Sequence, residues 1–105
     1  MSYEEVFDMA AETGLPFAYD HFAEGESPAP PFLVFRFPTE NHFAADGKAY
    51  FKTKQLDFEL YTAEKSPETE QLVNAVLDSH GLFYTWSEVW IPTENLYEVL
   101  YQMEV

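Results

Sequence analysis

Between Gln55 and Tyr61, apolar and polar residues alternate at every position, and this alternation constrains the fold more than any other feature. In an extended backbone, successive side chains point to opposite sides. The alternation therefore predicts a strand with one buried face and one polar face. The apolar side comprises Leu56, Phe58 and Leu60, and the other side comprises Asp57, Glu59 and Tyr61.

The same extended segment continues towards the N-terminus, where its character changes. Tyr50, Lys52 and Lys54 share a side with the core residues, which would place two lysines in the core. Either a β-bulge near Thr53 resets the register, or the strand leaves the core as a projecting arm. We favour the arm, because the 13 residues 49–61 would span roughly 40 Å at ~3.3 Å per residue, more than a small core requires.

A hairpin turn at Asp46-Gly47 is expected to form the tip of this arm, with Lys48 beside it. The turn would join Asn41–Ala45 to the long strand. The segment Leu15–Pro31 combines four prolines and three acidic residues with short aromatic patches, and it predicts an irregular loop. We expect the aromatic side chains to anchor part of that loop.

The remaining segments predict two helices and three further strands. A capping-box spacing at Ser2 and Glu5 starts a helix over Tyr3–Glu12. Ser66-Pro67 starts a second helix, with an apolar stripe at Leu72, Val73, Val76 and Leu77, which His80-Gly81 closes. The further strands are Phe32–Phe37, in which Arg36 needs a partner, Phe83–Ile91 and Leu96–Val105.

The element order is thus helix, three strands, helix, two strands. It predicts a single α+β domain over residues 1–105, in which one antiparallel or mixed sheet carries both helices on one face. Leu96–Val105 fits this sheet because its apolar residues alternate with Glu98, Gln102 and Glu104.

The charges are numerous and segregated along the chain. Nineteen acids and five bases give a net charge of −14, which disfavours binding to DNA, anionic lipids or anionic substrates. The five bases all lie in the middle third: Arg36, Lys48, Lys52, Lys54 and Lys65. One interpretation is an acidic surface that serves solubility. The other is a self-complementary subunit that attracts copies of itself head to tail, and such contacts close into rings.

The sequence gives no indication of catalysis. Its three histidines, His21, His42 and His80, have no spacing typical of metal ligands, and cysteine is absent. No phosphate loop, dinucleotide fingerprint or nucleophile elbow is present. Asp57 and Glu59 read as a solvated strand face rather than a glycosidase pair. We expect no enzyme activity, cofactor or metal, and a soluble chain, since no apolar run reaches the roughly 20 residues of a membrane span.

The aromatic residues Tyr84, Trp86 and Trp90 share one side of a predicted strand with Glu88. They could fill the core, as large aromatics often do in small domains. Because helices cover only one face of a lone sheet, an apolar face left over must meet either the Leu15–Pro31 loop or another chain. We favour another chain, with Trp86 and Trp90 in the contact together with Tyr50 and the arm lysines.

Five segments of the chain resemble the tail-terminator, or tail-completion, proteins of long-tailed phages and prophages of Gram-positive bacteria. They are Leu15–Phe22, Pro30–Val34, Asn41–Lys48, Leu60–Thr62 and Tyr97–Tyr101. The resemblance implies a structural subunit that forms a hexameric ring, caps the tail tube and meets the head connector proteins in the virion after assembly in the host cytoplasm. DNA would pass through an acidic lumen without specific binding.

A second class of function stays open at this stage. Phages also encode acidic proteins that mimic DNA and inhibit DNA-binding enzymes, and the charge of this chain permits that role. A mimic has no need of a basic arm, however. The clustering of Lys48, Lys52 and Lys54 beside a predicted hairpin therefore favours assembly.

Overall fold

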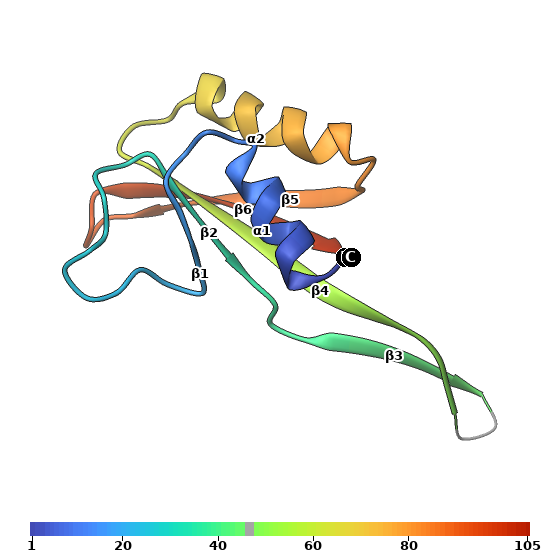
Figure 1. Ribbon diagram of the computed structural model, residues 1–105. Helices are drawn as coiled ribbons and strands as arrows, with labels where there is room; N and C mark the ends of the chain where they lie inside the picture. The colour runs from blue at the N-terminus through green and yellow to red at the C-terminus, as the bar shows by residue number, and fades with distance from the viewer. Residues whose placement is uncertain (46–47) are drawn as a thin grey trace.

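A computed structural model describes residues 1–45 and 48–105, with side chains for residues 1–39 and 53–105. The expected turn at Asp46-Gly47 lies outside the described residues. The elements follow in the order α1 (Tyr3–Ala11), β1 (Phe17–Tyr19), β2 (Phe32–Arg36), β3 (Glu40–Ala45), β4 (Lys48–Thr62), α2 (Pro67–Ser79), β5 (Tyr84–Ile91) and β6 (Leu96–Glu104) (Figure 1).

The strands form one mixed sheet in the order β1-β2-β4-β6-β5, and β3 pairs with β4 off this path. The α+β class and the predicted order of elements are confirmed. Strand β1 was not predicted. The loop prediction for Leu15–Pro31 was wrong at Phe17–Tyr19, because these residues pair in parallel with Leu33–Phe35. So short a strand has no periodicity of its own, and it forms because β2 offers a partner edge.

The hydrophobic core lies between one face of the sheet and both helices. Leu33, Leu60 and Val99 stand opposite one another across β2, β4 and β6, and all three are buried. The predicted alternation of β4 and β6 is thus confirmed. The helices cover the same face, with Val6, Met9 and Ala10 of α1 and Val73 and Leu77 of α2 in the core.

Local signals position both helices. In α1, the Ser2 hydroxyl accepts a hydrogen bond from the Glu5 amide at 3.1 Å while the Glu5 carboxylate accepts one from the Ser2 amide. The end of α2 passes into Gly81, whose φ of 68° is a conformation that glycine adopts without strain. The predicted apolar stripe was wrong at Leu72, which is exposed, because α2 turns only Val73 and Leu77 fully onto the sheet.

Strand β4 is longer than the sheet that contains it. Its segment 55–62 pairs with β6, and 57–61 also pairs with β2, whereas 48–54 pairs with β3. The β3–β4 ribbon therefore projects from the body as a two-stranded arm, as predicted (Figure 1). This arm accounts for the elongated shape of the molecule, with extents of 50 × 29 × 24 Å.

The loop after β1 covers one end of the sheet face that has no helix. Phe22 packs edge-on against Phe32 with ring centroids 5.4 Å apart, and Phe32 in turn stacks on Tyr61 at 5.1 Å. Phe32 and Val34 are buried as a result. The expected anchoring of this loop by an aromatic residue is therefore confirmed.

Candidate assembly interface

The two lateral edges of the main sheet differ in how well they are protected. At one edge, β1 has only three residues, and α1 lies against it through Phe7 on Phe17 and Tyr3 on Tyr19, with ring centroids 4.9 and 5.1 Å apart. At the other edge, β5 has eight residues and, within the described residues, pairs with β6 alone. Strand β5 is therefore a long edge with a free outer side.

The aromatic residues of β5 are accessible at this edge. Trp86 is 57% exposed and Trp90 42%, and Phe83, just before the strand, is 86% exposed. Only Tyr84 of this group reaches the core, where its ring meets Tyr101 edge-on at 5.6 Å. Core packing thus fails for the two tryptophans: the core contains Val73 and Leu77 of α2 but neither tryptophan, and α2 faces Trp86 with the polar residues Glu70, Gln71 and Asn74.

The cations that were predicted to act together lie in different surroundings. Lys54 stands at the root of the arm, with its Nζ 5.4 Å from the centre of the Phe37 ring. The backbone of Lys48, Tyr50 and Lys52 lies in the arm, and their side chains are outside the described residues. Lys65 is held within the chain, with its Nζ 2.7 Å from Glu70 and 2.8 Å from Glu88.

Arg36 finds its partner on the neighbouring strand. Its Nε lies 3.7 Å from Oε2 of Glu59 on the face of the sheet that has no helix. Asp57 on the same face is buried and accepts a hydrogen bond from the Gln55 amide at 3.2 Å. The interpretation of Asp57 and Glu59 as a solvated face was therefore wrong, since β2 and β6 flank both residues.

Two carboxyl groups on this face are partly desolvated. Burial raises the pKa of Glu59, although the Tyr61 hydroxyl donates to it at 3.2 Å and Arg36 lies beside it. Burial also raises the pKa of Glu98, and the charge of nearby Glu59 raises it further. Ionisation of Glu98 at neutral pH therefore reduces the stability of the fold.

Replacing this carboxyl is expected to stabilise the protein. A raised pKa in the folded state means that the fold favours the protonated form, so Glu98→Gln should raise the midpoint of thermal unfolding at pH 7 by roughly 2–4 °C. The gain should shrink as the pH falls towards 4, because Glu98 of the parent protein then becomes protonated and neutral, like the glutamine of the variant. Circular dichroism melts at both pH values measure it, with exposed Glu26→Gln as the control. An unchanged or lower midpoint at pH 7 would contradict this assignment.

The two histidines whose side chains are described lie far apart in the fold. His21 pairs with Asp20 at 2.8 Å in the exposed loop, and His80, just after α2, contacts Glu12, just after α1, at 2.5 Å. The side chain of His42 is outside the described residues. Among the residues that are described, no group of three or more His, Asp or Glu side chains is arranged to hold a metal ion.

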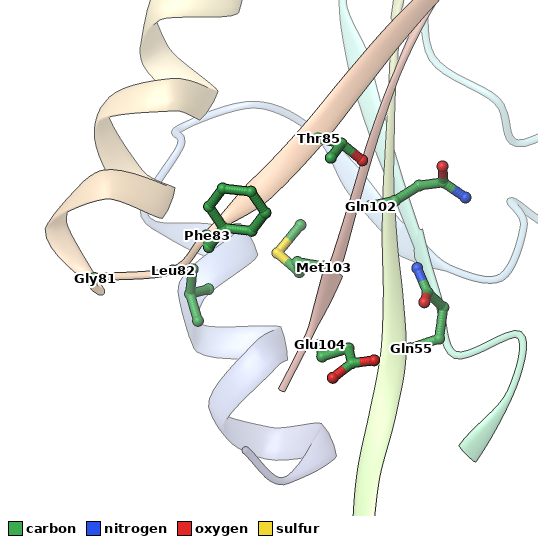
Figure 2. Close-up of a pocket in the computed structure, with 8 residues that line it drawn as sticks. All are labelled: Gln55, Gly81, Leu82, Phe83, Thr85, Gln102, Met103 and Glu104. Carbon is green, nitrogen blue, oxygen red and sulfur yellow. The ribbon is translucent and has the colours of Figure 1, made fainter. Parts of the chain in front are cut away.

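A shallow hollow of about 600 Å³ opens beside the start of β5 (Figure 2). Leu82, Phe83 and Met103 form its apolar side, and the polar groups are the hydroxyl of Thr85, the side-chain amides of Gln55 and Gln102 and the carboxyl of Glu104 (Figure 2). The hydroxyl and amide groups can exchange hydrogen bonds with a bound chain, and the carboxylate can accept them. The hollow can therefore contact a bound chain through both apolar and polar groups, and it adjoins the free edge of β5.

Comparison of the chain with known protein-family models and with curated proteins finds no match. Within the residues that the structure describes, no helix is both long enough and apolar enough to cross a membrane.

Proposed function

We propose that this chain is a ring-forming structural subunit of a phage or prophage tail, a tail terminator that caps the tail tube and joins it to the head connector. One observation carries the proposal: a projecting basic arm and a long free sheet edge are present on the same subunit. The arm, residues 40–54, has a net charge of +1, whereas the other residues together carry −15. Copies therefore present surfaces of opposite charge to one another.

The arm has a physical reason to dock. A two-stranded ribbon without a sheet or helix packed against it is marginally stable in water. Docking on a neighbouring copy supplies the missing contacts. Because the docking surface differs from the arm, each contact is heterologous, and a series of such contacts closes into a ring when the rotation between copies allows it.

The acidic remainder of the chain fits the proposed position between tail and head. A lumen lined with carboxylates repels the phosphates of passing DNA, so no counterion release holds the DNA on the protein. The proposed partners are thus further copies of the chain, the tail tube protein and the connector, with six copies expected in the ring.

Size-exclusion chromatography with light scattering tests the proposal over a wide range of protein concentration, for the protein alone and mixed with tubes of a phage tail protein. A discrete closed oligomer, seen as rings by electron microscopy, is expected. A monomer under all these conditions would overturn the proposal. A monomer that inhibits a DNA-binding enzyme would establish the DNA mimic in its place.

Reversing the charge of the arm should weaken the ring. The combined change of Lys48, Lys52 and Lys54 to glutamate removes three attractions worth roughly 0.2–1 kcal/mol each and adds repulsion, so the association constant should fall by roughly tenfold or more. The loss should be larger at 50 mM than at 500 mM salt, because salt screens exposed charges. Sedimentation equilibrium measures both constants.

The matched control changes the same three lysines to arginine, which keeps the charge of the arm. This variant should assemble like the parent protein. Equal association of the glutamate and arginine variants at low salt would refute the electrostatic role of the arm.

A further inference from the structure

We propose that the free edge of β5 receives strand β3 from the arm of a neighbouring copy, so that the sheet continues from one subunit into the next. This contact rests on the self-assembly proposed above and specifies its surface. The partner is an extended strand, recognised through main-chain hydrogen bonds and through the exposed side chains that flank them.

The register of the sheet identifies which main-chain N–H and C=O groups of β5 point away from β6. Lys54 and Val105 exchange two hydrogen bonds, at 3.1 and 2.9 Å, so alternate residues of β6 counted back from Val105 bond to β4. The residues between them face β5, where they pair with Thr85, Ser87, Val89 and Ile91. The outward N–H and C=O groups are therefore those of Tyr84, Trp86, Glu88 and Trp90.

This edge lacks most of the devices that keep sheet edges from pairing, and the charge of its one acid, Glu88, is paired with Lys65. Tyr84–Ile91 contains no proline and no lysine, and its register with β6 is continuous. Large apolar side chains flank the edge on both faces, Trp86 and Trp90 on the helix side and Val89, 51% exposed, on the other. An incoming strand would thus bury apolar surface on each face as well as pair its backbone.

Strand β3 is placed to enter such an edge. It lies on the same side of β4 as β2 does, whereas β6 and β5 lie on the opposite side (Figure 1). In the part of the chain that the structure describes, β3 pairs with β4 alone, so its outer side is free. The donor and acceptor edges face opposite directions, which is the geometry of a head-to-tail contact.

Charge favours the arm over a second copy of β5 as the occupant. Residues 84–104 contain four acids and no lysine or arginine. Pairing of two β5 edges would bring two such segments together, with Glu88 near its counterpart, and like charges opposite one another destabilise a sheet. Strand β3 itself contributes one acid, Glu40, and the three lysines of the arm lie on β4, the strand paired with it, so the arm as a whole approaches the same segment with a net charge of +1.

Hydrogen–deuterium exchange of the assembled and monomeric fractions tests the contact without assuming its register. The peptides from β3 and the peptides from β5 should both exchange more slowly in the assembly than in the monomer. At the outward amides the exchange rate should fall by at least tenfold. Slower exchange in β5 but not in β3 would show pairing of β5 with itself and overturn the proposal. Unchanged exchange in β5 within intact rings would also overturn it and leave the proposed function standing. Failure to assemble under any condition would refute the proposed function as well.

A pair of variants at one residue gives an independent test. Glu88→Pro removes an outward N–H without breaking a bond to β6, and Glu88→Thr removes the same carboxylate but keeps the amide. The proline variant should lose at least tenfold in association while the threonine variant assembles like the parent, with both monomers folded by circular dichroism. Equal assembly of the two would overturn the proposal. If the proline variant does not fold, the exchange experiment on the parent protein decides.

Discussion

Replacing Phe58 with alanine is expected to cost about 3–5 kcal/mol of folding free energy, the range measured for large-to-small changes at buried aromatic residues. Phe58 is fully buried in β4, and it stands opposite Phe35 on one neighbouring strand and Tyr101 on the other. Its ring centroid lies 6.2 Å from that of Phe35. The truncation therefore opens a cavity in the middle of the sheet, where three strands share one layer of side chains.

The free energy lost in the Phe58→Ala variant is a large share of the total stability of the domain. A domain of this length is expected to be stable by about 5–15 kcal/mol, so the Phe58→Ala variant should unfold at a far lower denaturant concentration or fail to fold at 37 °C. Urea unfolding followed by circular dichroism measures the change. Phe83→Ala is the matched control, because it removes the same ring from a position that is 86% exposed and should change stability by less than about 0.5 kcal/mol. Similar losses for the two variants would show that the assigned core is wrong.

Shortening the arm is expected to abolish assembly and leave the fold intact. In the variant considered, Asn-Gly replaces residues 42–52, so that Asn41 and Thr53, which pair in the ribbon, are joined by a two-residue turn. The body keeps the segment of β4 that β2 and β6 flank. The midpoint of thermal unfolding should therefore stay within roughly 5 °C of the parent value, a shift worth about 1 kcal/mol.

The oligomeric state of this variant should change although its thermal stability does not. Without the arm, light scattering should report a monomer at every concentration at which the parent protein is assembled. The control is the single change Asp46→Asn, which introduces the same Asn-Gly pair but keeps the length of the arm, and it should assemble normally. A shortened variant that still forms rings would contradict the role of the arm, and one that unfolds would show that the arm supports the body.

The main elements of the fold could be predicted because their signals are local. Ser2 and Glu5 define the start of α1, Gly81 ends α2, and the alternation in β4 and β6 assigns their buried faces. The projecting arm could be predicted as well, since lysines on the apolar side of a strand are incompatible with its staying in the core. Strand β1 could not, because it depends on a partner that lies distant in the sequence.

Burial was harder to predict than secondary structure, because it depends on what lies next to each strand. The polar side of β4 looks solvated from sequence, yet Asp57 is buried between two other strands. Core packing was the alternative weighed for Trp86 and Trp90, yet both are largely exposed, and α2 faces Trp86 with polar residues rather than with its buried Val73 and Leu77. No periodicity encodes how far a helix reaches across a sheet.

The continuity of β4 between body and arm has a mechanical consequence. A pull on the arm acts along β4, which is held on both sides by antiparallel ladders whose hydrogen bonds run across the direction of the pull. Such a load shears many bonds at once instead of peeling them one after another. A subunit anchored in this way should transmit tension to its neighbour in the ring, and the contact between subunits should break before the body of the subunit unfolds.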